Sequence, residues 1–168
     1  MTRTHLLQGI TIALLFCACA KQTDKNDKNS WIVSIPPLKY IVESITEQDL
    51  PVEILLPPGA TPETYEPTPA QMTALSDSRL VFTTGLIDFE RQLSERFSNT
   101  IAENRIVNLS ENISLITGEH NHTGHKGTDP HIWTSPAALK QMASTAYRQI
   151  ALLYPDSTRY AVNYRNVL

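Results

Sequence analysis

The chain has 168 residues, which is enough for one ordinary domain with a buried core. Apolar residues make up 41% of it and charged residues 18%, the proportions of a folded protein rather than a disordered one. The net charge is −3 and lysines and arginines form no cluster, so we expect no nucleic acid among its partners.

Residues 1–18 have the features of an export signal. The apolar run Leu6–Phe16 is too short to span a bilayer comfortably. It leads to Ala18 and Cys19, and a small residue before a cysteine resembles the cleavage and lipidation site of bacterial lipoproteins. We therefore predict that Cys19 carries a lipid; the alternative is an ordinary signal peptide cut near Ala20.

Residues 19–30 are polar and predict a flexible tether between the lipid and the domain. Both cysteines of the chain, Cys17 and Cys19, belong to the signal region. The mature chain is therefore expected to have neither an internal disulfide nor a thiolate metal site.

After the tether, short β-rich runs alternate with helix patterns. The first helix has two prolines, Pro36 and Pro37, in its first turn and carries an apolar stripe from Leu38 to Ile45. The second begins at Thr68, an N-cap whose capping box Gln71 completes. The third can be capped by Asp88 and repeats apolar residues every four positions. The β-rich runs are Trp31–Ile35, Val52–Leu56, Leu80–Thr83 and Arg105–Leu109.

Two helix patterns end the sequence. Ser135 caps the first, Pro136 stands in its first turn, and its apolar face predicts core packing rather than a binding surface. Pro155 ends this helix, and Asp156–Ser157 can cap the next one. That last helix stops at Leu168 without a capping residue or a polar tail.

This alternation predicts an α/β domain with an open, largely parallel four-stranded sheet flanked by helices. The sequence has neither a G-x-G-x-x-G motif nor a Walker-type loop, so nucleotide binding has no support.

Four of the five histidines lie within the twelve residues from His120 to His131. Neutral imidazole is the commonest protein ligand for transition metals, so the cluster predicts metal binding; a solvated polar insertion is the alternative. In open α/β sheets, ligands bind outside the carboxyl ends of the strands. Two loops there offer ligands, Glu63 after the second strand and His131 after the fourth. This pair suits zinc, manganese or iron, although a closed zinc site normally takes four ligands.

The order of motifs resembles the zinc/manganese solute-binding family, the metal-binding lipoproteins of bacterial ABC importers. The resemblance runs from about Trp31 to Leu168 and implies that His131 is a ligand. It also implies that His120, His122 and His125 form a mobile loop that helps to collect zinc. The matching motifs are Ser34-Ile35-x-Pro37-Leu38, Leu56-x-Pro58-Gly59, Tyr65-Glu66-Pro67-Thr68-Pro69, Leu80-Val81-x-x-x-Gly85 and Asp129-Pro130-His131-Ile132-Trp133.

The chain departs from this family in two ways. Glu63 stands where the family usually carries a histidine ligand; a solvent-exposed loop acid is the alternative reading of Glu63, and its neighbour Glu66 is structural by resemblance. The family also has two α/β lobes joined by a long helix, with the metal between them. We expect residues 31–136 to form the N-terminal lobe and residues 137–168 to hold a helix and the start of the joining helix, with the C-terminal lobe absent.

The resemblance implies a binding protein, not an enzyme, that is exported and lipid-anchored on the periplasmic or cell-surface side. It would capture a divalent metal, Zn²⁺ first and Mn²⁺ or Fe²⁺ as alternatives, and deliver it to the permease of an ABC importer. The competing readings are a nonfunctional remnant, a surface interaction lipoprotein and a zinc hydrolase, for which no H-E-x-x-H motif is present. We further expect Asp129 to form a turn and Trp133 to pack in the core.

Overall fold

The sheet has four short strands, all running in the same direction. A computed structural model describes residues 30–97, 105–115 and 128–167. The strand order is β2-β1-β3-β4, and each neighbouring pair is parallel. The prediction of an open, parallel α/β sheet is therefore confirmed. The strands are β1 (Trp31–Val33), β2 (Val52–Ile54), β3 (Leu80–Thr83) and β4 (Ile106–Asn108).

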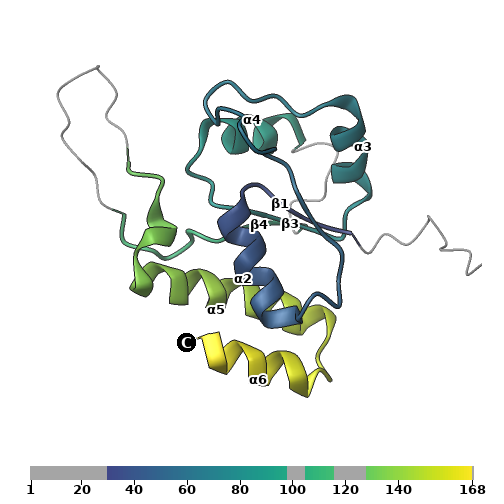
Figure 1. Cartoon of the computed structure of the whole chain (residues 1–168), viewed down its shortest axis with the longest axis vertical. Coiled ribbons are helices and arrows are strands. Elements are labelled where there is room, and N and C mark those ends of the chain that lie inside the picture. Colours follow the sequence, from purple (N-terminus) through teal and green to yellow (C-terminus); the bar gives the residue numbers. More distant parts are fainter. Residues whose placement is uncertain (1–29, 98–104, 116–127, 168) are drawn as a thin grey trace, which may run out of the picture.

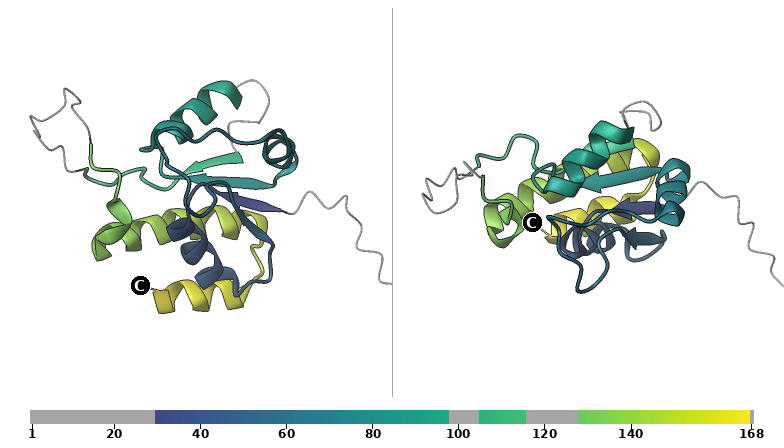
Figure 2. Two further views of the ribbon diagram at one scale, coloured as in Figure 1. Left: turned by 45° about the horizontal axis from the view of Figure 1, so that its top comes forward. Right: turned by 90° about the horizontal axis from the view of Figure 1, so that it is seen from above.

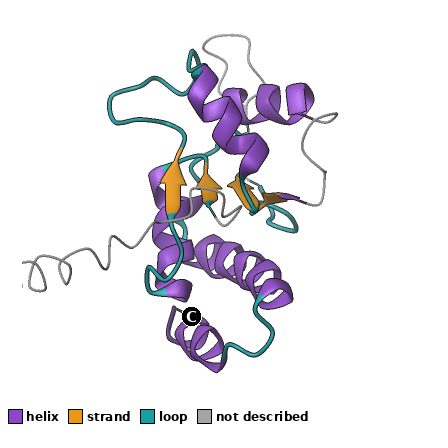
Figure 3. Cartoon of the chain, turned by 90° about the vertical axis from the view of Figure 1, so that its right-hand side faces the viewer, coloured by secondary structure: helices purple, strands orange, loops and turns teal. Residues whose placement is uncertain are grey.

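Helices cover both faces of this sheet (Figure 1). Because βαβ connections are right-handed, the reversal of strand order at β1 sends the first connecting helix to one face and the next two to the other. Figures 2 and 3 show α3 and α4 on one side, and α2, α5 and α6 on the opposite side. The helices are α2 (Pro36–Thr46), α3 (Pro69–Asp77), α4 (Asp88–Phe97), α5 (Pro136–Leu153) and α6 (Thr158–Val167), with a 3₁₀ turn η2 at Ile132–Thr134.

One hydrophobic core joins the sheet to α2 and α5. The residues of β1 and β3 are all buried, as the continuous apolar runs of a parallel sheet require. The predicted stripe of α2 is buried from Leu38 to Ile45. On α5, Met142 and Ile150 are fully buried in the same core, which confirms core packing for that helix. No helix in the described part of the chain is long and apolar enough to cross a membrane.

The helix starts follow the predicted capping in three cases and depart from it in one. Ser157 accepts a hydrogen bond from the Tyr160 amide at the start of α6. Thr68 and Gln71 form the capping box of α3, and Ser135 accepts a hydrogen bond from the Ala138 amide at the start of α5. Asp88 is not the N-cap of α4. The Ile87 carbonyl already accepts from the Arg91 amide at 3.2 Å, so Ile87 is the capping position, and the Asp88 carboxylate pairs with the Arg91 guanidinium instead.

Candidate metal centre

The segments that follow the strands meet at one edge of the sheet, here called the carboxyl edge. The loop after β2 spans residues 55–68, and the chain after β4 leads to residues 128–135. These two segments come from the outermost strands. Three inter-strand spacings separate them, or roughly 14 Å at their roots. They must therefore lean toward the middle of the edge to act together.

His131 is oriented by the carboxylate two residues before it. Asp129 Oδ1 accepts a hydrogen bond from the His131 backbone amide at 2.9 Å and lies 2.8 Å from His131 Nδ1. An ionised carboxylate can only accept, so Nδ1 carries a proton, and in the neutral imidazole Nε2 then carries the lone pair. The imidazole side chain is 64% exposed. A carboxylate that fixes the tautomer and ring of a histidine is the usual arrangement around metal-bound imidazoles.

The Asp129 carboxylate is held in its charged form by the same contacts. The backbone amide of His131 lowers the pKa of Asp129, and the hydrogen bond from the His131 ring lowers it further. A carboxylate that accepts from the amide two residues ahead forms an Asx turn, which is the role predicted for Asp129. The contact to Nδ1 gives the same side chain a second role, because it aims the imidazole.

A small cavity of about 120 Å³ lies beside this pair. The His131 ring also meets the Trp133 ring edge-on, with the centroids 5.2 Å apart. Trp133 is partly buried and packs against the core, as predicted. The imidazole is thus supported on one side and open to a small ligand on the other. The cavity is lined by Ile113, Ser114, Asp129, His131, Ile132, Thr134, Ser135 and Ala138.

The loop after β2 has a firm base. Tyr65 Oη lies 2.5 Å from the Leu55 carbonyl oxygen and 2.8 Å from Gln71 Oε1, and its single proton can serve one of them at a time. Gln71 Nε2 also donates to the Leu55 carbonyl, at 2.9 Å. Glu66 pairs with Arg96 of α4 at 3.7 Å, so this acid has a structural partner in the exposed rim of the loop.

Glu63 is exposed at the tip of this firmly based loop. Within residues 30–97, 105–115 and 128–167, no three His, Cys, Asp or Glu side chains converge on a point that could hold a metal ion. Among the described residues, the two predicted ligands Glu63 and His131 are therefore separate candidates at the carboxyl edge. The other predicted site residues, His120, His122, His125 and Cys19, lie outside the described residues.

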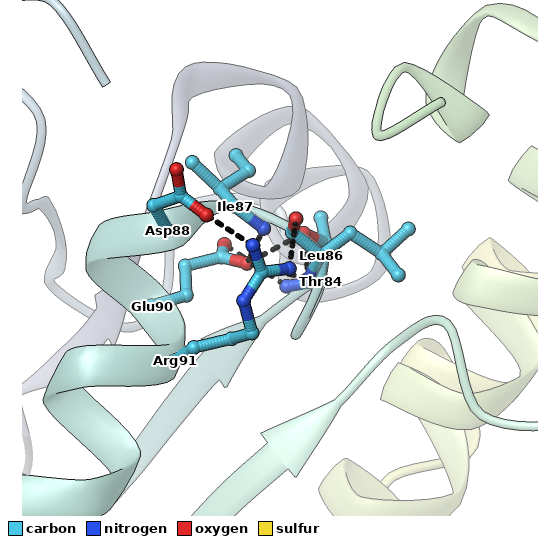
Figure 4. A network of polar contacts seen from close by, with 6 residues as sticks. All are labelled: Thr84, Leu86, Ile87, Asp88, Glu90 and Arg91. Carbon is cyan, nitrogen blue, oxygen red and sulfur yellow. Dashed lines mark hydrogen bonds and ion pairs between the residues drawn. The ribbon is translucent and has the colours of Figure 1, made fainter. Parts of the chain in front are cut away.

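Sequence reasoning missed one residue of this edge, the buried carboxylate of Glu90. It is fully buried and accepts from the Ser34 hydroxyl at the end of β1. It also accepts from the Thr84 amide at 3.0 Å and the Thr84 hydroxyl at 2.6 Å. The amides of Leu86 and Ile87 complete the shell at 3.2 and 3.4 Å (Figure 4). The signal was present, because a glutamate at the third helical position commonly reaches back to the helix start.

The sequence also matches a known protein family. The model of the ZnuA family, described as "Zinc-uptake complex component A periplasmic", matches residues 32–168. The chain belongs to this family. Among the relatives, the high-affinity zinc uptake system protein ZnuA of Yersinia pestis is 31% identical over 151 residues, which cover 75% of this chain and 47% of the relative. The manganese-binding lipoprotein MntA of Halalkalibacterium halodurans is 29% identical over 128 residues, covering 74% and 41% respectively.

Solved structures of the ZnuA family have the same fold. A crystal structure of ZnuA superposes with a TM-score of 0.72 at 33% identity, covering 83% of this chain and 52% of that one. The chain spans about half the length of the relatives it matches. The described sheet, its helices and its carboxyl edge therefore correspond to one part of a ZnuA-family protein.

Proposed function

We propose that the chain binds a divalent transition metal, zinc foremost, as the extracytoplasmic binding component of a metal ABC importer. Binding and release, with no chemical step, deliver the ion to a membrane permease. His131 supplies a nitrogen ligand through Nε2, and Glu63 supplies a carboxylate oxygen. His120, His122 and His125 help to collect zinc, and Cys19 carries the lipid that anchors the chain.

One observation carries this proposal: the pairing of Asp129 with His131 in a ZnuA-family chain. The carboxylate fixes the ring at 2.8 Å from Nδ1, and Nε2 is left with its lone pair beside a cavity at the carboxyl edge. Zinc accepts imidazole nitrogen and carboxylate oxygen together, and manganese prefers the oxygen-rich version of such a site. The relatives named for zinc and for manganese agree with that range of metals.

Zinc titration of the purified chain, in competition with a chelator, tests the proposal. We expect His131→Ala to lower zinc affinity at least tenfold and Glu63→Ala to lower it by less. The matched control is Glu111→Ala, which removes an exposed carboxylate after β4 on the same edge. Its zinc affinity should stay at the value of the unaltered chain. Equal zinc affinities in the unaltered chain and His131→Ala would contradict the assignment of His131.

The remaining roles have separate readouts. Replacing His120, His122 and His125 by alanine together should slow zinc association while leaving the equilibrium affinity of the His131 site nearly unchanged. Cys19→Ala should release the exported protein from the membrane fraction. A Cys19→Ala protein that stays membrane-bound would instead point to an anchor other than the lipid.

A further inference from the structure

The crevice where α/β sheets usually bind ligands is closed in this chain by Glu90. The strand order reverses between β1 and β3, and such a switch point normally leaves a crevice at the carboxyl ends of the two strands. Here Ser34 follows β1, Thr84 follows β3, and both donate to the Glu90 carboxylate. The shell around this carboxylate consists of donors, which suits the ionised form. Glu90 thus joins the two central strands to the start of α4.

The helix that Glu90 fixes is also the support of the loop that carries Glu63. Phe89, the neighbour of Glu90, meets the Tyr65 ring edge-on with centroids 5.4 Å apart. Further along α4, Arg96 pairs with Glu66. The space between the loop and α4 is only about 10 Å³, the lower limit for holding a single water. The loop therefore rests directly on α4, and a shift of the helix start must move it.

We propose that Glu90 is a positioning residue for the metal site, acting through α4 and Tyr65 on the loop that presents Glu63. This inference rests on the proposed function, because it concerns the share that Glu63 contributes to metal binding. His131 stands on a different segment, after β4, and the contact that orients its ring is to Asp129, two residues away. Loss of the Glu90 carboxylate should therefore remove the contribution of Glu63 and leave that of His131.

A double-mutant cycle on zinc affinity tests this coupling, with Glu90→Gln and Glu63→Ala made singly and together. Each oxygen of Glu90 accepts from at least one backbone amide, from Thr84 on one side and from Leu86 and Ile87 on the other. A glutamine must therefore turn its NH₂ group toward an amide donor. We expect Glu90→Gln to lower zinc affinity severalfold, by no more than Glu63→Ala does, because Glu90 acts through the loop that presents Glu63. In the Glu63→Ala chain the same change should have less than a twofold effect.

A matched control separates positioning from a general loss of stability. Asn163 is a buried polar residue whose amide donates to the Ile45 carbonyl at 3.0 Å, near the end of α2 and away from the carboxyl edge. Asn163→Ala should lower the melting temperature without changing zinc affinity. Ser34→Ala, which removes one donor from the Glu90 carboxylate, is the milder variant should Glu90→Gln fail to fold. Ser34→Ala should also weaken zinc binding, but by less than Glu90→Gln does.

A metal-free measurement distinguishes failure of this inference from failure of the proposed function. The Thr64 amide donates to the Thr61 carbonyl at 3.1 Å inside the loop. Its hydrogen exchange should accelerate in Glu90→Gln, or in Ser34→Ala, and stay unchanged in Asn163→Ala. Unchanged exchange at Thr64, or an equal loss of zinc affinity with and without Glu63, would overturn the positioning role. Accelerated exchange in a chain that binds no zinc would refute the proposed function instead.

Discussion

Replacing Gly85 by alanine should destabilise the carboxyl edge through two separate effects. Gly85 joins β3 to α4 with a φ of +67°, in the left-handed region that favours glycine. An added Cβ would also lie 2.6 Å from Nδ2 of Asn108 and 3.0 Å from its Cγ. Asn108 ends β4, and its Oδ1 accepts from the Ser110 amide and the Ser110 hydroxyl, both at 2.9 Å. The Asn108 side chain must therefore move to admit the methyl group.

The magnitude follows from these two effects. The left-handed backbone costs an alanine roughly 1–2 kcal/mol. Moving Asn108 weakens two hydrogen bonds, each contributing about 1 kcal/mol to the free energy of unfolding. We expect Gly85→Ala to lose about 2–4 kcal/mol, less than the roughly 5–15 kcal/mol that keeps a domain folded. Gly59 is the matched control, because its φ is +81° and no atom lies within 4 Å of an added Cβ. Gly59→Ala should lose only about 1–2 kcal/mol.

Urea unfolding, followed by the fluorescence of buried Trp31, measures both losses. The difference between Gly85→Ala and Gly59→Ala should be about 1–2 kcal/mol, the share assigned to the two Asn108 hydrogen bonds. Adding Asn108→Ala to Gly85→Ala should cost less than the sum of the two single changes, because the crowded side chain is then gone. Equal losses in the two glycine variants, or strict additivity with Asn108→Ala, would refute the reasoning from Asn108.

Four further predictions concern the proposed metal site and the core. Asp129→Asn should lower zinc affinity by roughly tenfold, which is the smallest effect usual for a residue that orients a metal ligand, because the Asp129 side chain is exposed. An unchanged zinc affinity would contradict the orienting role of Asp129. The His131 amide lowers the pKa of Asp129 below its ordinary value of 3.8. The hydrogen bonds from His131 to the Asp129 carboxylate should therefore be fully formed above pH 3.8 and be lost as the pH falls through the lowered pKa. NMR titration of the Asp129 carboxyl group would follow this loss. Met142→Ala, at a fully buried position, should lose about 2–5 kcal/mol of unfolding free energy in urea. Leu152→Ala, at a side chain 74% exposed on the same helix, should change it by no more than about 0.5 kcal/mol. Glu63→His should raise the ratio of zinc to manganese affinity in paired titrations, since imidazole suits zinc better, and an unchanged ratio would show that Glu63 is not a ligand.

The strands could be located from sequence because each is a short, continuous apolar run. Their ends could not be fixed in the same way. The run at Trp31–Ile35 continues two residues beyond the end of β1 at Val33. Ser34 and Ile35 are buried even though they lie outside the strand, at 0% and 3% exposure. Apolar patterning reports burial, and burial here extends past the last paired residue of the sheet to Ile35, the N-cap of α2.

The site could be predicted only where its contacts are local. Asp129 and His131 are two residues apart, so a turn and an imidazole beside it could be expected from the motif. Glu90 and Ser34 are 56 residues apart, and the strand order that brings them together cannot be predicted from either segment alone. Asp88 was predicted to cap α4 because aspartate favours the N-cap position. In the structure Ile87 is the capping position, and Glu90 reaches back to accept from the amides of Leu86 and Ile87.

The position of the proposed metal site follows from what occupies the middle of the carboxyl edge. Because Glu90 closes the crevice between β1 and β3, the predicted ligands come from the loops of the outer strands, β2 and β4. A sheet fixes the roots of such loops but not their tips. The tips are set by local anchors, Tyr65 on one side and Asp129 on the other. Changes at these anchors should therefore alter metal affinity far more than stability, whereas changes in the core, such as Met142→Ala, should do the reverse.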